Sequence, residues 1–394
     1  MNVVFISTAQ YPNGGAAANR HMAYAKGLLE AGHDVSFVLL SEQKQPYQEY
    51  SNDGIKYYCA FPKPPKNNKG KLGILITQVR YISAAKREIL KIHKNSKIGA
   101  LVLLNTYILE LIPLIWMAKI NSIKVLHERT EYPFVSVRKK MIDRIELYIY
   151  TSYVLRKFNG IYVISNSLKI YFDKILDNKI PTKVINMVVD PNRFKTIETE
   201  TKDIYRYITY CGTINDEKDG VDILVKAFGS ALRSNKLASD VKLILIGNYI
   251  DEIFKVRLNK IIDDEKCRNN ILFTGDVETN KIPGLLNNAS ALVLARPKSL
   301  QAEGGFPTKL GEYLATGKPV IITNVGEINL FLRDGYNAFI AEPGDVNSFA
   351  EKIIEVFSDY TKALVIGQQG KALVEKEFNY YHQAVELAHF IESL

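Results

Sequence analysis

Short runs of β-branched and aliphatic residues alternate along the chain with amphipathic stretches of helical length. Ten such runs predict buried strands: a first series at 3–7, 35–40, 100–104, 124–127 and 161–165, and a second at 207–212, 242–247, 271–275, 291–295 and 319–323. Strands that alternate with helices are typical of βα units on a parallel sheet. A polar stretch at 195–203 separates the two series and is a candidate linker.

Two strand series predict two domains. The 394 residues exceed the roughly 250–300 at which a single hydrophobic core stops growing. We therefore expect an α/β protein with two doubly wound domains, at 1–195 and 204–376, followed by a C-terminal segment at 377–394. Ligands of open parallel sheets bind at the carboxyl ends of the strands, so we expect these edges of both sheets to face a central cleft.

Composition excludes several classes of protein. Charged residues make up 24%, and 24 glycines and 14 prolines are ordinary usage, which excludes disordered, collagen-like and coiled-coil chains. Three scattered cysteines form no disulfide framework and favour a reducing, cytoplasmic compartment. The most apolar stretch, 100–120, is interrupted by Asn105, Glu110 and Pro113, which argues against a membrane-spanning helix. The first residues lack the basic and apolar regions of a signal peptide.

Charge is concentrated in the N-terminal half. Residues 1–190 hold 27 Lys and Arg against 14 Asp and Glu, a net +13, whereas the remainder holds 24 against 28, a net −4. Within the first half, 63–97 carries ten basic residues and one acid, Glu88. Such a field attracts phosphate groups or an anionic membrane surface, and solvated lysines are the alternative.

Adjacent glycines follow the first predicted strand. Gly14 and Gly15 open a helix at 16–20, where they would let a ligand approach the backbone at a helix N-terminus. A plain tight turn is the alternative. Neither domain has G-x-G-x-x-G after its first strand, which argues against a hydride-transferring dinucleotide enzyme.

The segment 296–320 carries the most specific chemistry. Gly304, Gly305 and Phe306 precede Pro307, which suits the first turn of a helix whose N–H groups can bind a diphosphate. Further polar groups for a nucleotide are supplied by Arg296, Thr308 and Lys309. Glu312 lies about one and a half turns into the helix and can accept hydrogen bonds from a ribose. A helix that simply ends at Gly317 explains only part of this pattern.

With these motifs the sequence resembles the family 4 glycosyltransferases of the GT-B type, particularly bacterial members of polysaccharide synthesis. The resemblance is carried by the Gly-rich opening and by the segments at 32–35, 188–194, 212–228, 273–277 and 334–339. It implies transfer of a sugar from a nucleotide-diphosphate donor in the C-terminal domain to an acceptor in the N-terminal domain, with retention of anomeric configuration. We expect the last helix, 377–394, to pack back toward the N-terminal domain.

The resemblance assigns roles residue by residue, with two departures. Glu312 matches the second glutamate of the family's E-x7-E motif, which binds the donor ribose. The first glutamate should stand where this chain has Gly304, and Glu303 lies one position further away. Either a bulge restores Glu303, or the backbone of 304–306 contacts the sugar; we favour backbone contacts with Glu303 assisting.

The second departure concerns the diphosphate. After Gly212, where many members have arginine, this chain has Thr213. Lys218 resembles the family's phosphate-binding lysine and, with Arg296 and Lys309, can neutralise the leaving group; an exposed loop lysine is the alternative. The base is expected near 247–248 and 276–277, with Asn248 and Val277 in contact.

His127, after the strand at 124–126, matches a family histidine beside the donor sugar and the reaction centre. A buried structural histidine is the alternative. The chain contains no D-x-D sequence and no histidine pair with metal-ligand spacing, so we expect neither metal nor cofactor. Since no carboxylate nucleophile is evident, we expect a same-face mechanism in which a donor diphosphate oxygen takes the acceptor's proton.

We therefore predict a cytoplasmic, metal-independent, hexosyltransferase-type enzyme using a UDP- or GDP-sugar and a glycan or lipid-diphosphate-linked acceptor, with no nucleic acid partner. A nucleotide-sugar epimerase and a non-catalytic nucleotide-sugar-binding protein are the alternatives. Helical apolar spacing at 71–94, after the basic 62–70, predicts peripheral contact with an anionic membrane through 63–97, whereas an ordinary core helix would give the same spacing.

Overall fold

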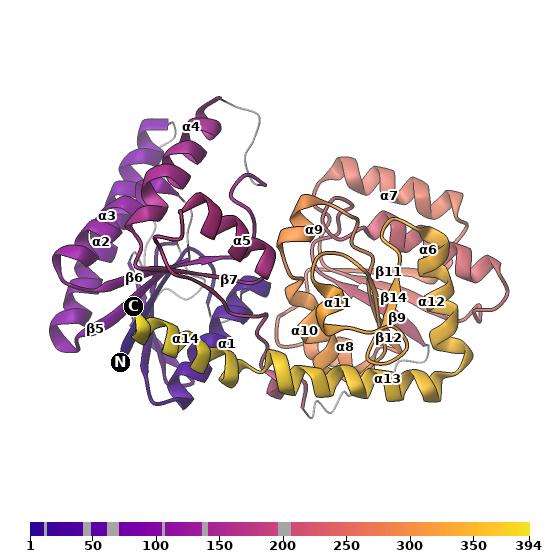
Figure 1. The fold of residues 1–394 in the computed structure, drawn as a ribbon. Coiled ribbons are helices and arrows are strands. Elements are labelled where there is room, and N and C mark those ends of the chain that lie inside the picture. The colour runs from indigo at the N-terminus through magenta and orange to yellow at the C-terminus, as the bar shows by residue number, and fades with distance from the viewer. Residues whose placement is uncertain (12–13, 42–48, 61–70, 105–106, 136–140, 196–205) are drawn as a thin grey trace. The chain divides into compact units, whose positions relative to one another are not determined.

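The computed structural model describes residues 1–11, 14–41, 49–60, 71–104, 107–135, 141–195 and 206–394. The chain divides into two compact units: unit 1, formed by Met1–Val188 with Tyr380–Leu394, and unit 2, formed by Val189–Asn379 (Figure 1). These boundaries differ from the predicted 195 and 377 because Val189 forms a parallel bridge with Asn379 and donates a hydrogen bond to the Phe378 carbonyl at 3.0 Å. Most of the predicted linker, 195–203, lies outside the described residues.

Unit 1 is built on a sheet that has eight strands within the described residues, in the order β3-β4-β2-β1-β5-β6-β7-β8. All neighbours are parallel except β3 and β4. Burial on both faces explains why the central strands are continuous apolar runs rather than alternating ones. The bounds are β1 Asn2–Ser7, β2 Asp34–Leu39, β3 Glu49–Asn52, β4 Ile55–Cys59, β5 Ile98–Leu103, β6 Lys124–Arg129, β7 Gly160–Val163 and β8 Thr182–Val184.

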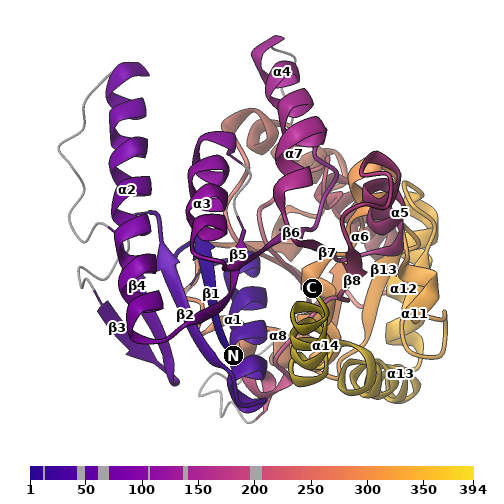
Figure 2. The same cartoon turned by 60° about the vertical axis from the view of Figure 1, so that its left-hand side comes forward.

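The helices of unit 1 include one from the far end of the chain. They are α1 Ala16–Glu30, α2 Lys71–Asn95, α3 Ile108–Ile120, α4 Met141–Ile149, α5 Asn166–Ile175 and α14 Tyr380–Ser393. α14 lies against α1 in both views of the fold, and its Leu387 and Ile391 complete the apolar core around β1 and β2 (Figures 1 and 2). The Tyr380 hydroxyl donates to the Glu30 carboxylate at 2.8 Å. α2, α3 and α4 stand beside one another on one side of the unit (Figure 2).

Unit 2 has a six-stranded, all-parallel sheet within the described residues, in the order β11-β10-β9-β12-β13-β14. Its strands are β9 Tyr207–Cys211, β10 Lys242–Ile246, β11 Ile271–Gly275, β12 Ala291–Leu294, β13 Val320–Thr323 and β14 Phe339–Ala341. Its helices are α6 Val221–Arg233, α7 Glu252–Asp264, α8 Ile282–Asn288, α9 Leu300–Gly304, α10 Thr308–Ala315, α11 Ile328–Phe331, α12 Val346–Ser358 and α13 Tyr360–Leu373.

All ten predicted strands are present, with ends shifted by one or two residues. Four strands were not predicted: β3, β4, β8 and β14. The helix expected at 71–94 is α2. Each sheet therefore presents its carboxyl-end loops at one edge, and these loops carry the residues predicted to bind ligand.

Candidate donor-binding site

Three glycines shape the carboxyl edge of the unit 2 sheet. Gly212, Gly247 and Gly275 follow β9 and β10 and end β11, with φ of +150°, +127° and +67°. A Cβ on Gly247 would lie 2.2 Å from the Gly212 carbonyl oxygen, and one on Gly212 would lie 2.1 Å from the Lys309 side chain. The two strand ends therefore approach too closely for a side chain at Gly247, whereas the end of the Lys309 side chain could shift away from one at Gly212. Asn248, exposed, and Val277, half-buried, continue this edge.

Asp219 is the charged centre of the site, although no role was predicted for it from the sequence. Its carboxylate is 3% exposed and lies 2.7 Å from Lys309 Nζ and 4.0 Å from Arg296 Nε. The Tyr210 hydroxyl lies 2.7 Å from the same carboxylate. Burial acts to raise the pKa of Asp219, but Lys309, Tyr210 and Arg296 together lower it. Two of the three cations predicted for a diphosphate are thus held together by one carboxylate.

The loop that carries Asp219 also holds Thr213 and Lys218. Both side chains are exposed, while their carbonyl groups are fixed inside the loop. The Thr213 carbonyl accepts from Asn215 at 2.7 Å, and the Lys218 carbonyl accepts from Arg296 Nε at 3.2 Å. Lys218 is therefore an exposed cation on a backbone that is held in place.

The glycine-rich segment leads from α9 into α10. Ser299 caps α9, and Gly304, Gly305 and Phe306 are buried, with the Phe306 ring packed against Phe331 and Phe378. Only the backbone of Phe306 is then available to a ligand, whereas Glu303 is exposed on α9.

Pro307 was expected inside the first turn of the helix that follows. Instead it is the N-cap of α10, in an extended conformation, so that the helix begins at Thr308. The first N–H groups of α10 have no acceptor within the helix itself.

Glu312 makes an ion pair that was not predicted. Its Oε1 lies 2.6 Å from Arg193 Nη1, on the short helix Pro191–Phe194, and both side chains are largely buried. Asp190 fixes this short helix by accepting from the Asn192 N–H at 3.0 Å. Arg193 belongs to one of the segments that carried the family resemblance, but no role was given to it. The pair fixes the orientation of the Glu312 carboxylate.

Three predicted site residues belong to unit 1. Gly14 is required by packing, because a Cβ there would lie 2.2 Å from the Gln10 carbonyl oxygen and 2.5 Å from Ala18 Cβ. Gly15 is the extended N-cap of α1, with open space around its Cα. His127 requires a correction: it lies within β6 rather than after the strand, and it is fully buried instead of facing a cleft.

The imidazole of His127 is enclosed by partners on all sides. Its Nδ1 lies 2.7 Å from the Leu103 carbonyl, its Nε2 lies 2.7 Å from the Tyr150 hydroxyl, and Phe158 stacks on the ring at 4.6 Å. Burial, assisted by the charge of Arg129, lowers the pKa of His127 to about 3. His127 is therefore a neutral, positioned ring in this structure.

The residue after His127 organises a buried polar cluster. Glu128 accepts from Arg20 Nη2 at 3.0 Å and lies 2.7 Å from His21 Nε2, and Tyr11 lies 2.7 Å from His21 Nδ1. Burial acts to raise the pKa of Glu128, but Arg20 and His21 lower it. The cluster ties the start of α1, and with it the Gly14–Gly15 turn, to the carboxyl end of β6. The sequence showed these residues, but not that they meet.

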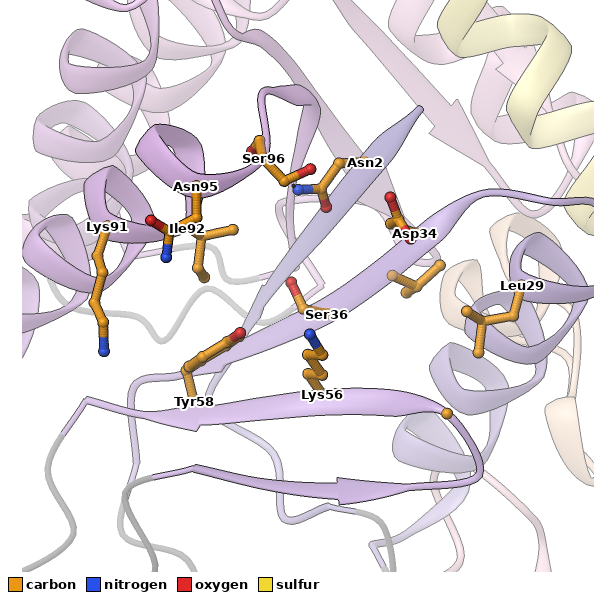
Figure 3. A pocket seen from close by; sticks show the side chains of 12 residues that line it. Asn2, Leu29, Asp34, Ser36, Lys56, Tyr58, Lys91, Ile92, Asn95 and Ser96 are labelled. Atoms are coloured by element: carbon orange, nitrogen blue, oxygen red, sulfur yellow. Dashed lines mark hydrogen bonds between the residues drawn. The ribbon is translucent and has the colours of Figure 1, made fainter.

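A cavity of about 350 Å³ lies elsewhere in unit 1 (Figure 3). It is lined by Asn2, Asp34 and Ser36 from the amino ends of β1 and β2, and by Lys91 and Asn95 from the end of α2. Parallel sheets bind ligands at the opposite edge, and none of the predicted site residues lines this cavity. This cavity is therefore not part of the candidate donor-binding site.

Among the described residues, no group of three His, Cys, Asp or Glu side chains could hold a metal ion. Within the same ranges, no helix is both long and apolar enough to cross a membrane.

Comparison with known proteins identifies relatives of unit 2 and of the whole fold. Residues 205–359 match the family described as Glycosyl transferases group 1. A glycosyltransferase of Methanocaldococcus jannaschii is 28% identical over 175 residues, 44% of each chain. The GDP-mannose-dependent alpha-(1-6)-phosphatidylinositol monomannoside mannosyltransferase of Mycobacterium tuberculosis is 26% identical over 180 residues, again 44% of each chain. The chain thus matches less than half the length of these relatives.

Solved structures match over the whole chain. Sucrose-phosphate synthase from Thermosynechococcus elongatus superposes with a TM-score of 0.75 at 14% identity, covering 100% of this chain and 98% of that one. Anabaena HepE in complex with UDP-glucose gives 0.72 at 16% identity, with full coverage of both chains. The predicted GT-B fold class is confirmed.

Proposed function

We propose that this protein is a glycosyltransferase that uses a nucleotide-diphosphate sugar. Its residues 205–359 match the group 1 glycosyl transferases, and its fold is GT-B. The observation that carries this proposal is the carboxyl edge of the unit 2 sheet. There, glycines clear the backbone, Lys309 and Arg296 supply cations beside Lys218, and Arg193 holds the Glu312 carboxylate. Preorganised cations of this kind stabilise a departing diphosphate.

In the proposed site, Glu312 binds the ribose hydroxyls, and Lys309, Arg296 and Lys218 meet the diphosphate. The backbone of 304–306 contacts the donor sugar, with Glu303 assisting, and the base lies near Asn248 and Val277. The donor is a UDP- or GDP-sugar; HepE was solved with UDP-glucose, and the mycobacterial relative is GDP-mannose-dependent.

The finer features of the reaction are also part of the proposal. The sugar is transferred with retention and without a metal, to a glycan or lipid-diphosphate-linked acceptor of bacterial surface polysaccharide synthesis. NMR of the product's anomeric configuration tests retention, since an inverted centre is incompatible with the same-face mechanism.

We also propose peripheral contact with an anionic membrane, but through a different surface from the one expected at 63–97. Residues 63–70 lie outside the described ranges. In α2, Ile82, Ile89 and Ile92 are buried as in an ordinary core helix, while Ile76 and Val79 are exposed. Exposed apolar side chains instead follow one face of α3 and one face of α4: Leu109, Ile112, Trp116 and Ile120, then Met141, Ile142, Ile145 and Tyr148. Basic residues of α2 and α4, including Arg80, Arg87 and Arg144, are also exposed.

Nucleotide binding followed by donor turnover tests the function. Thermal stabilisation is measured with UDP, GDP, ADP and CMP, and then hydrolysis or transfer with the matching sugar donors. Stabilisation by one nucleoside diphosphate with slow donor hydrolysis is expected. Donor conversion to an epimer without acceptor would favour the epimerase, and binding with no turnover on lipid-linked sugars would favour the binding protein.

Two substitutions test the assigned residues. Glu312→Ala and Lys218→Ala should each reduce kcat/KM by an amount equivalent to about 2–4 kcal/mol, as the loss of other preorganised polar contacts does. Lys260→Ala, an exposed lysine of α7, is the matched control and should leave kcat/KM unchanged. Wild-type rates in both site variants would remove these residues from the site.

A further inference from the structure

Arg129, the last residue of β6, is a buried cation that the proposed donor site does not use. The residue is 8% exposed. Its Nη2 donates to the Glu131 carbonyl at 3.2 Å, and its buried Nε has no hydrogen-bond partner among the residues that the structure describes. The neighbouring carboxylate, Glu128, is occupied by Arg20 and His21. In the described part of the chain, no ion pair joins Arg129 to an acid.

Burying a guanidinium in this position costs free energy. Burial removes its hydration, and a buried charge is normally compensated by an opposite charge with matching hydrogen bonds. One carbonyl and the face of the Tyr150 ring, 5.7 Å from Cζ, are weak substitutes for a carboxylate or phosphate. The planar, five-donor guanidinium is suited to binding an oxyanion.

An aromatic surface adjoins this cation. Tyr132 and Phe134, directly after β6, stack at 5.0 Å, and Tyr171 of α5 meets both rings edge-on at 5.1 and 5.8 Å. Phe134 is 36% exposed, and both tyrosines are partly exposed. The hydrogen bond from Arg129 to the Glu131 carbonyl holds the guanidinium beside the residue that directly precedes Tyr132. Aromatic walls with a few convergent polar groups are typical of small-molecule sites.

We propose that Arg129 and the Tyr132–Phe134–Tyr171 surface form an acceptor subsite for a sugar that carries an oxyanion, either a phosphate or a carboxylate. The aromatic rings take the apolar face of the sugar ring, and the guanidinium takes the charged group. This assignment rests on the proposed glycosyl transfer and adds the chemical class of its acceptor.

Ligand binding tests the subsite independently of turnover. Wild-type protein is titrated with glucose 1-phosphate, glucuronate, glucose, inorganic phosphate and UDP, and affinity is followed by calorimetry. At least one anionic sugar should bind, and glucose should bind at least about ten-fold more weakly, since hydrogen bonds between charged groups are the strong ones. The two anionic sugars distinguish a phosphate from a carboxylate as the recognised group.

Three variants complete the design. Arg129→Met should weaken the anionic sugar at least about ten-fold without changing UDP affinity. Tyr171→Ala should weaken the sugar phosphate while leaving inorganic phosphate unchanged. Arg333→Met, an exposed arginine of unit 2, should behave as wild type in every titration.

Stability separates this role from a structural one. Because no carboxylate among the described residues pairs with Arg129, the cation contributes no ion-pair energy to the fold, so Arg129→Met should fold at least as stably as wild type in the absence of ligand. A large fall in melting temperature would assign Arg129 to the fold and overturn the proposal. So would wild-type affinity in Arg129→Met, or the failure of both anionic sugars to bind the wild type. Loss of UDP binding or of turnover alone would overturn the donor site but not this one.

Discussion

Gly247 is the residue whose replacement should be most informative about the donor edge. Its φ of +127° is accessible only to glycine, and a Cβ would also collide with the Gly212 carbonyl oxygen at 2.2 Å. Gly247→Ala should lower the free energy of unfolding of unit 2 by more than the roughly 1–2 kcal/mol of a left-handed residue alone. The measurement is urea unfolding together with nucleotide affinity.

The matched control for that substitution is Gly335→Ala. Gly335 has φ of +68°, but a Cβ there would meet nothing within 4 Å, so only the conformational cost applies. Equal losses in the two variants would mean that the close approach at Gly247 carries no energy.

His127 should make the stability of unit 1 depend on pH. Its pKa is about 3 in the fold against the usual 6.5, so below pH 6.5 the unfolded chain takes up a proton that the folded chain does not. The free energy of unfolding therefore falls as pH falls, by about 1.4 kcal/mol per pH unit well below 6.5. Between about pH 6 and pH 5, His127→Gln should reduce the slope of the free energy of unfolding against pH by about one proton. Some slope should remain, because the pKa of His21 is also lowered in the fold.

His382→Gln, at an exposed position of α14, is the control for that experiment and should leave the slope unchanged. An unaltered slope in His127→Gln would mean that His127 titrates in the folded protein as it does in the unfolded chain.

Sequence reasoning at the residue scale succeeded for backbone chemistry and failed for long-range pairs. The glycines and the Gly-Gly-Phe-Pro segment are local features, and they lie where the pattern placed them. The partners Lys309–Asp219 and Arg193–Glu312 are 90 and 119 residues apart, and only the folded unit 2 brings them together. His127 was misplaced because a strand end cannot be fixed to within two residues from an apolar run.

At the scale of elements, strands with continuous apolar runs were predictable, whereas β3, β4, β8 and β14 were not. β1, β9 and β12 are short apolar runs buried by helices on both faces. β8 is only partly buried, and β3 pairs at the rim of the sheet, so neither has a strong apolar pattern. The β3–β4 hairpin did carry a signal: Asp53 and Gly54, with φ of +50° and +81°, form the Asp-Gly turn typical of such hairpins.

α4 provides the element-scale prediction. None of its residues is buried, and its apolar face is exposed, with Met141 at 78% and Ile142 at 69%. Ile142→Ser with Ile145→Ser should abolish salt-sensitive co-sedimentation with anionic vesicles, since each buried apolar side chain and each nearby basic residue adds about 1–3 kcal/mol to such binding. Trp116, the single tryptophan, should shift its emission to the blue on vesicles in the wild type.

Ile253→Ser in unit 2, where the side chain is 83% exposed, is the control for α4 and should bind vesicles normally. Equal sedimentation of all variants with neutral and anionic vesicles would contradict the proposed membrane contact and would leave only a soluble acceptor to consider.

At the scale of the whole molecule, the two compact units should each have a free energy of unfolding that responds separately to substitutions in that unit. Leu387 of α14 is fully buried in the core of unit 1, although 191 residues of unit 2 precede that helix. Leu387→Ala should lower the free energy of unfolding of unit 1 by about 2–5 kcal/mol and leave unit 2 unchanged. Hydrogen exchange at β1 and β9 reports the two units.

Leu286→Ala, fully buried in α8 of unit 2, should give the opposite pattern. Faster exchange at β9 rather than β1 in Leu387→Ala would show that α14 does not stabilise unit 1.

The return of α14 to α1 also sets an order of events during translation. β1 and α1 are synthesised before unit 2, yet the face of α1 that receives Ala384 and Leu387 stays uncovered until α14 has been synthesised. Unit 2 has its complete sequence before that moment and can close around its own sheet. Unit 1 is therefore begun before unit 2 but completed after it. A nascent chain that stalls before Tyr380 would release a folded unit 2 joined to an incomplete unit 1. The uncovered apolar surface of that unit 1 would be open to chaperones or to aggregation.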